Sequence, residues 1–119
     1  MSGAALHLVG HIDGPVIQTV DELRAIMKRA SQTCHFTVVN EAFHQFHPFG
    51  ATGVLVLAES HFSAHTYPEH SMVYVDVFCC ARHFDPDTCS RVLDHEFSGR
   101  GTWRVISRTS NHVKDKDDE

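Results

Sequence analysis

Residues 57–70, with the sequence LAESHFSAHTYPEH, place several titratable side chains at the end of a continuous apolar run. Glu59, Ser60 and His61 follow the run directly, and His65 comes four residues after His61. Polar residues are common where a strand ends, but so dense a group is less common. This segment is therefore the first candidate for chemistry in the chain.

Metal binding is the first chemistry to consider, because the chain holds eleven histidines. On a helix, the spacing of His61 and His65 would suit a pair of zinc ligands. Polar and apolar residues alternate after Ser60, however, which predicts a strand on which the two histidines lie roughly 13 Å apart. Compact ligand spacing is also missing among His44, His47, His70 and His83. We therefore expect dispersed histidines rather than a metal site.

Two adjacent cysteines, Cys79 and Cys80, end the segment MVYVDVFCC. Adjacent residues of a strand point to opposite faces, so at most one of the two thiols can join a site on a given side. Cys79 shares its face with three valines, which indicates a small core residue. Cys80 shares its face with Tyr74 and Asp76 and is the better candidate for a chemical thiol. The four cysteines of the chain show no CxxC spacing, and we expect them to be reduced.

Apolar periodicity predicts the elements that must position these residues. Residues 5–12 favour a strand, and Thr19 with Glu22 forms a possible capping box before an amphipathic helix at about 20–31. The segment 34–46 is rich in strand-forming residues. The apolar run 54–58 is typical of a strand covered on both faces. Alternating patterns continue at 60–67 and 72–80.

The C-terminal part predicts a second helix and a last strand. Asp85 and Pro86 suit an N-cap and a first helical turn, Gly99 is placed to end the helix, and residues 102–106 favour a short strand. The predicted order is β-α-β-β-β-α-β. It indicates an α+β fold, a two-layer α/β sandwich whose antiparallel sheet carries two helices on one face. We expect one domain at 1–112 and a charged, disordered tail at 113–119.

Composition excludes several classes of protein. The chain has 119 residues, a net charge of −5 and 42% hydrophobic residues, which is typical of a globular domain. It shows no basic patch for a nucleic acid and no apolar run near the roughly 20 residues of a membrane span. The N-terminal MSGAALHLVG lacks the features of a signal peptide, so we expect a cytoplasmic location.

A family resemblance connects these residues. ESHFSAHTYPEH followed by VDVFCC resembles the core motif of the bacterial and archaeal S-adenosylmethionine decarboxylases, pyruvoyl-dependent enzymes that cut themselves at a Glu–Ser bond. The preceding FHQFHPFGATG is also similar to that family, and the match spans about residues 43–80.

The resemblance implies a self-processing enzyme. The Ser60 hydroxyl would attack the Glu59 carbonyl, and elimination would divide the chain into residues 1–59 and 60–119. The new N-terminus at position 60 would then hydrolyse to a covalent pyruvoyl group. His65 would handle the proton in this processing. The pyruvoyl ketone would form a Schiff base with the substrate amine and accept electrons as CO2 leaves. Cys80 would then return a proton to carbon.

The same resemblance implies the substrate and the assembly. Phe46 and Tyr67 would stack on the adenine of S-adenosylmethionine, Glu69 would accept hydrogen bonds from the ribose, and the processed chains would form a homodimer. After YPEH, however, residues 71–73 are Ser-Met-Val where the family usually has Gly-Tyr-Ala. Decarboxylation of ornithine or arginine therefore stays open as an alternative. A non-catalytic partner subunit and a zinc-binding module are further alternatives.

Overall fold

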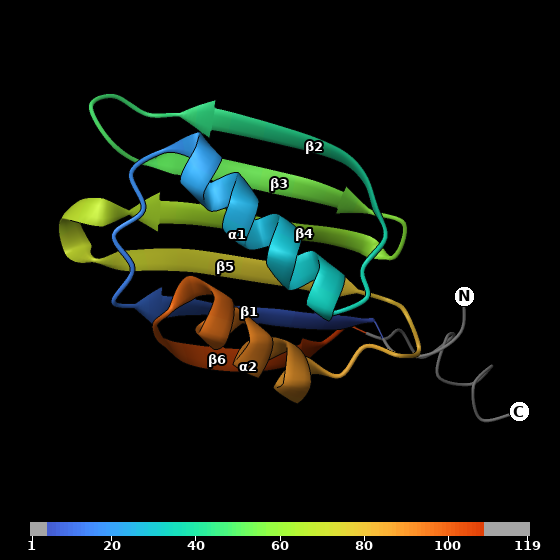
Figure 1. Ribbon diagram of the computed structural model, residues 1–119. Coiled ribbons are helices and arrows are strands. Elements are labelled where there is room, and N and C mark those ends of the chain that lie inside the picture. The colour runs from blue at the N-terminus through green and yellow to red at the C-terminus, as the bar shows by residue number, and fades with distance from the viewer. Residues whose placement is uncertain (1–4, 109–119) are drawn as a thin grey trace, which may run out of the picture.

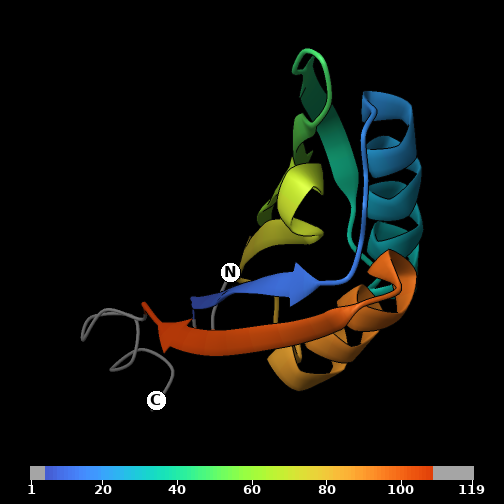
Figure 2. The same ribbon diagram turned by 90° about the vertical axis from the view of Figure 1, so that its left-hand side faces the viewer.

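The computed structural model describes residues 5–108, so the predicted tail at 113–119 lies outside the described residues. Within this range, six strands form one sheet in the order β2-β3-β4-β5-β1-β6, and all neighbours are antiparallel. Figures 1 and 2 show both helices on the same side of the twisted sheet. The elements are β1 (Leu6–Asp13), α1 (Val20–Thr33), β2 (Val38–Gln45), β3 (Ala51–Leu57), β4 (Ser60–Tyr67), a 3-10 turn (Pro68–His70), β5 (Met72–Cys79), α2 (Pro86–Phe97) and β6 (Arg100–Ser107).

The predicted fold class is confirmed, with one correction to the element order. The described chain has four strands between its two helices, whereas the predicted order has three. β3 and β4 form a tight hairpin that leaves only Ala58 and Glu59 between them. The strand segments expected at 34–46, 54–58, 60–67 and 72–80 correspond to the four observed strands, so the predicted order counts one strand too few although each segment is located.

Both helices begin at the predicted caps. The Thr19 hydroxyl accepts a hydrogen bond from the Glu22 backbone N–H at 3.2 Å, and the Asp85 carboxylate accepts one from Asp87 N–H at 3.2 Å. At the end of α2, the residue in the left-handed conformation is Ser98, with φ of 56°, rather than the predicted Gly99. Gly99 is needed for a different reason, because a Cβ there would lie 2.5 Å from Ile12 Cγ2 and 2.6 Å from Asp13 O.

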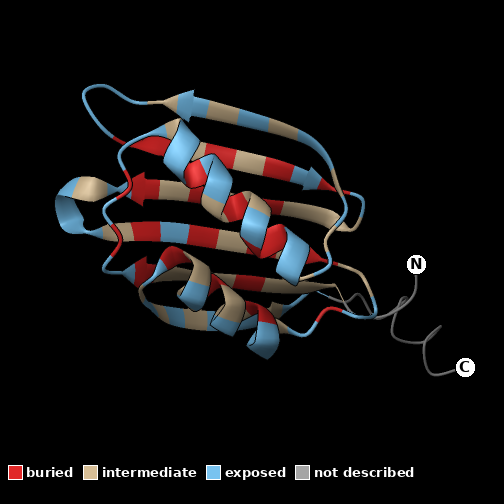
Figure 3. Cartoon of the chain, viewed as in Figure 1, coloured by how far each residue is buried: buried red, intermediate tan, exposed pale blue. Residues whose placement is uncertain are grey.

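The core lies between the helices and one face of the sheet. Figure 3 shows buried bands alternating with less buried ones along the strands, as a period of two requires. The largest fully buried apolar side chains come from strands and helices alike: Leu8, Ile12, Leu23, Met27, Leu55, Phe62, Val73, Val77 and Leu93. Burying each of these contributes about 1.5–3 kcal/mol, which makes this layer the main source of stability.

The opposite face of the sheet carries no helix within the described residues. The run 54–58 was predicted to be covered on both faces, but Val56 is 42% exposed on this side. Tyr67 and Tyr74 of the neighbouring strands are 39% and 47% exposed. We call this surface the open face, and the side chains of His61, His65 and Asp76 belong to it.

Candidate active site

The β3–β4 hairpin holds the predicted cleavage point. Leu57 pairs with Ser60 across the turn, and Ser60 pairs with Cys79 of β5. The Glu59 carbonyl oxygen accepts a hydrogen bond from the Cys80 backbone N–H at 3.2 Å. A donor at this position polarises the carbonyl that a nucleophile would attack.

Two further features tie down the same peptide bond. The Glu59 carboxylate accepts a hydrogen bond from the Thr37 backbone N–H at 3.0 Å, which holds the turn against the segment after α1. Ser60 has φ of 157°, a value that a residue with a side chain adopts only at a cost in free energy. Hydrogen bonds therefore fix Glu59 on one side of the predicted scissile bond, and the backbone of Ser60 on the other side is strained.

The two adjacent cysteines lie as the alternation predicts. Cys79 is 0% exposed in the core, and this burial raises the pKa of its thiol. Cys80 follows at the end of β5 and is only half-buried. Of the two thiols, Cys80 is therefore the one available to a substrate.

A second group of predicted site residues lies at the other end of the open face. Phe46, His65, Tyr67 and Glu69 line one cavity of about 330 Å³, a volume suited to a small molecule. The His65 ring centroid lies 5.4 Å from that of Phe46 and 5.2 Å from that of Tyr67. The cavity thus combines flat aromatic walls, an imidazole and a carboxylate.

Thr52 supports His65 and was not predicted from the sequence. Its hydroxyl forms a hydrogen bond with His65 Nδ1 across the β3–β4 pair, where the two residues are register partners. This bond fixes the orientation of the imidazole ring. Only the strand register could have revealed it, because the residues are thirteen positions apart.

The two groups of predicted residues do not meet within one chain. Glu59, Ser60 and Cys80 lie together at the end of the sheet where β4 begins and β5 ends, while His65 lies further along β4. Five residues of strand separate Ser60 from His65, a distance of roughly 16 Å. A proton cannot pass directly between side chains so far apart.

A third cluster lies between the two groups. Asp76 forms a hydrogen bond with His7, and His61 Nε2 lies 3.9 Å from the same Asp76 oxygen. Among residues 5–108, no group of three histidine, cysteine or carboxylate side chains is arranged to hold a metal ion.

In the same range, neither helix is long and apolar enough to span a bilayer.

Comparison with known proteins identifies close relatives. The sequence model of the S-adenosylmethionine decarboxylase family matches residues 7–109. The chain is 42% identical over 94 residues to the S-adenosylmethionine decarboxylase proenzyme of Symbiobacterium thermophilum, covering 78% of this chain and 71% of that protein. It is 32% identical over 122 residues to the proenzyme of Fervidobacterium nodosum, covering 100% of this chain and 85% of that one.

The Aquifex aeolicus relative links sequence and structure. Its S-adenosylmethionine decarboxylase proenzyme is 39% identical over 84 residues, which cover 71% of this chain but only 60% of that protein. The crystal structure of the adenosylmethionine decarboxylase from Aquifex aeolicus superposes with a TM-score of 0.78 at 28% identity. This superposition covers 93% of the present chain and 99% of the solved one.

Proposed function

We propose that this chain, which belongs to the S-adenosylmethionine decarboxylase family, cleaves itself before Ser60 and then decarboxylates S-adenosylmethionine. The relatives named proenzymes support the self-processing, and their names support the substrate. The product would be the aminopropyl donor used to make spermidine. The cytoplasmic location expected from the N-terminal sequence stays a prediction.

One observation carries the proposal: the Cys80 backbone N–H binds the Glu59 carbonyl at 3.2 Å. It places the predicted scissile peptide and the predicted proton donor side by side. A structural hairpin would not need a strained serine beside a half-buried thiol.

Self-cleavage would use only groups that the protein itself supplies. The Ser60 hydroxyl attacks the carbonyl carbon of Glu59, and the Cys80 N–H stabilises the negative charge that develops on the oxygen. The peptide bond becomes an ester. Elimination then needs a base near the Ser60 Cα, and His65 of a second copy of the chain supplies the imidazole. The chain ends as residues 1–59 and 60–119, which remain folded together.

The residues around position 60 fit a pyruvoyl group. Ser60 begins β4 and is paired with Leu57 of β3 on one side and with Cys79 of β5 on the other. Cys80 directly follows Cys79 in the sequence. The pyruvoyl ketone supplies an electrophile that accepts the electron pair released as CO2 leaves. Cys80 then delivers the proton of its thiol to the substrate carbon that lost the carboxylate.

Substrate binding would fall to the cavity at the other end of the open face. Phe46 and Tyr67 present flat rings that can stack on an adenine, and Glu69 presents a carboxylate that can accept hydrogen bonds from ribose hydroxyls. Ornithine and arginine have no flat ring to stack. No relative reported above favours either of these substrates.

A homodimer would bring the separated groups together. His65 and the substrate cavity lie too far from Ser60 of the same chain, so a complete site requires a second copy whose open face covers the first. A twofold axis would then place His65, Phe46 and Tyr67 of one chain beside Ser60 and Cys80 of its partner. The same contact would cover the exposed Val56 and Tyr74.

Intact mass spectrometry of the purified protein tests the processing. We expect two species, residues 1–59 and residues 60–119 with a pyruvoyl end, and one full-length species for Ser60→Ala. A full-length mass for the unmutated chain would overturn the proposal.

Release of CO2 from S-adenosylmethionine, ornithine and arginine, measured separately, tests the substrate. Only the first should react. A processed protein that acts on arginine but not on S-adenosylmethionine would leave the chemistry standing and refute the named substrate.

A further inference from the structure

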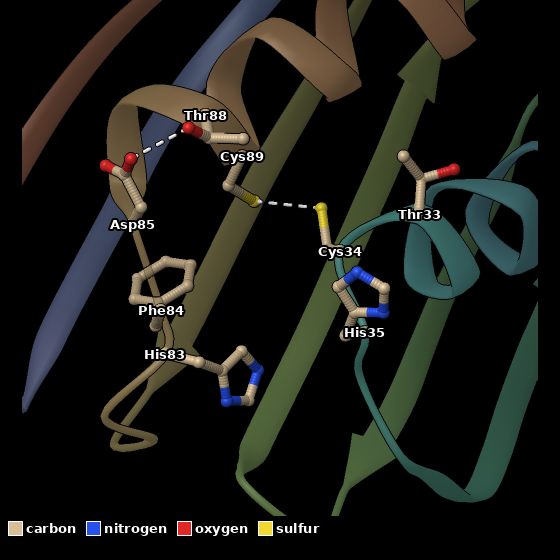
Figure 4. A pocket seen from close by; sticks show the side chains of 8 residues that line it. All are labelled: Thr33, Cys34, His35, His83, Phe84, Asp85, Thr88 and Cys89. Carbon is tan, nitrogen blue, oxygen red and sulfur yellow. Dashed lines mark hydrogen bonds between the residues drawn. The ribbon is translucent and has the colours of Figure 1, made fainter.

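Two cysteines outside the proposed active site lie side by side. Cys34 caps the end of α1 and Cys89 lies in α2, and their sulfur atoms are 3.7 Å apart in a hydrogen bond (Figure 4). A disulfide needs about 2.05 Å between sulfurs, so each Sγ would have to move by less than about 1 Å. The two residues are 55 positions apart, and no sequence spacing indicates the pair.

The surroundings make the two thiols unequal. Cys89 is 3% exposed, whereas Cys34 is half-buried. The hydrogen bond with Cys89 lowers the pKa of the Cys34 thiol, although burial opposes this. The same bond, with burial, raises the pKa of Cys89. Cys34 is therefore the sulfur that ionises first and can attack, and Cys89 is the protected one.

A cavity gives access to the pair. Both cysteines line a space of about 310 Å³ together with His35, His83 and Phe84. Figure 4 shows the Cys34 and Cys89 sulfurs pointing toward each other. The volume lies at the lower end of the range for small-molecule pockets, about 300–1,000 Å³.

We propose that Cys34 and Cys89 form a thiol–disulfide exchange site that reacts with low-molecular-weight disulfides. The Cys34 thiolate attacks one sulfur of the small disulfide, forming a mixed disulfide and releasing one thiolate, which takes up a proton. Cys89 then loses its proton to solvent, and its sulfur attacks the Cys34 sulfur and displaces the second thiolate. The protein dithiol loses two electrons and two protons, and the small disulfide becomes two thiols.

The location gives this bond a particular consequence, which rests on the proposed self-cleavage. Cys34 belongs to residues 1–59 and Cys89 to residues 60–119, so the oxidised pair would join the two fragments covalently. The bond would also clamp the segments that position the cleavage hairpin. Thr37, whose N–H binds Glu59, follows Cys34 closely, and the segment from Cys80 leads into α2.

The test uses the full-length protein after self-cleavage. It is incubated with oxidised glutathione, remaining thiols are alkylated after denaturation, and the product is examined by non-reducing electrophoresis, intact mass and peptide mapping. We expect the two fragments to migrate as one species that dithiothreitol separates. Peptide mapping should find Cys34 joined to Cys89, with Cys79 and Cys80 alkylated.

Variants separate the two sulfurs. Cys89→Ser should stop at a stable Cys34–glutathione adduct, whereas Cys34→Ser should leave Cys89 unmodified. Four alkylated cysteines in the unmutated protein, or a linkage to Cys79 or Cys80, would overturn the proposal. Peptide mapping of the unmutated protein decides the question, so the test remains valid even if a variant fails to fold.

Ser60→Ala separates failure of this inference from failure of self-cleavage. This variant should stay full-length, and after oxidation it should be lighter by two hydrogen atoms, with the same linkage in the map. If the linkage forms in both proteins but neither is cleaved, only the proposed function fails. If both fragments exist but stay unlinked and fully alkylatable, only the exchange site fails.

Discussion

The chemistry of the proposed site depends on which side of a strand each thiol occupies. Cys79 is buried among core valines and its pKa is raised, while its neighbour Cys80 is half-buried at the strand end beside Glu59. In the proposed mechanism, processing uses the backbone N–H of Cys80, which every residue but proline provides. Decarboxylation would use its thiol. A substitution of the side chain should therefore separate the two reactions.

Cys80→Ala is the substitution that tests this separation. We expect self-cleavage to proceed as before, since the N–H remains, and decarboxylation to fall by at least about 100-fold, since no thiol returns the proton. Mass spectrometry measures the first reaction and CO2 release the second. Cys34→Ser, which lies outside the site, serves as the control and should retain both. Loss of cleavage in Cys80→Ala would show that the thiol acts earlier than proposed.

Thr52 offers a test of how His65 is held. Thr52→Val keeps the shape of the side chain but removes the hydroxyl that binds His65 Nδ1. We expect self-cleavage to slow roughly fivefold, the effect of losing a hydrogen bond worth about 1 kcal/mol. The time course of cleavage after synthesis, followed by gel, gives the rate. Thr52→Ser restores a hydroxyl and should restore most of the cleavage rate. Equal rates in all three proteins would show that Thr52 has no role in self-cleavage.

Residue type and alternation predicted the positions of site residues within a single strand, but not contacts between different elements. They placed Cys79 in the core and Cys80 outside it, and the burial confirms this. Thr52 and the Cys34–Cys89 pair were missed, because each depends on contact between distant elements. Family resemblance supplied the roles of Ser60 and His65, and those roles stay predictions.

At the scale of the elements, α2 is capped at its start and joined to the sheet further along. Asp85 caps α2 at its start, and Asp94 further along accepts a hydrogen bond from Trp103 Nε1 of β6 at 2.9 Å. Caps and amphipathic stripes are local signals, so both helices were predicted within about two residues. The β3 boundary was harder, because Gly53 does not look like a strand residue. It is required there because the Phe43 ring occupies the place of a Cβ.

The cap of α2 gives a pH-dependent prediction. Hydrogen bonds from the Thr88 hydroxyl and from backbone N–H groups lower the pKa of Asp85. A lowered pKa means that the unfolded chain binds the proton more readily, so the stabilisation is complete above the ordinary pKa of about 3.9 and is lost as the pH falls through the folded value. Asp85→Ala should therefore lower Tm by a few degrees at pH 7, and this difference should shrink toward pH 3.

Thermal unfolding followed by circular dichroism at several pH values measures this difference. Asp85→Ser is the matched control, because a serine cap carries no titrating charge. Its advantage over Asp85→Ala should stay constant across the same range. If the difference in Tm between the unmutated protein and Asp85→Ala grew as the pH fell, the predicted pH dependence would be wrong.

At the scale of the whole molecule, one layer is left uncovered. The helices shield one face of the sheet (Figure 2), while the open face exposes Val56, Tyr67 and Tyr74 beside polar groups. Exposed apolar surface of this kind marks an interaction site. The two groups of proposed active-site residues lie at opposite ends of the sheet. One contact with a second copy would therefore both cover the exposed apolar side chains and complete the active site.

Mixing two inactive variants tests whether the site is shared. Ser60→Ala keeps His65 but has no nucleophile, and His65→Ala keeps the nucleophile but has no imidazole, so neither should cleave itself alone. When the two chains are refolded together in equal amounts, about half of the His65→Ala chains should pair with a Ser60→Ala partner. In those pairs the partner's imidazole reaches the intact Ser60, so about half of the His65→Ala chains, and no Ser60→Ala chains, should be cut. Mass spectrometry distinguishes the fragments of the two variants by their residue masses. If the mixture stays uncut while size-exclusion chromatography shows mixed dimers, Ser60 and His65 do not act across the interface, and the proposed way of completing the site is wrong.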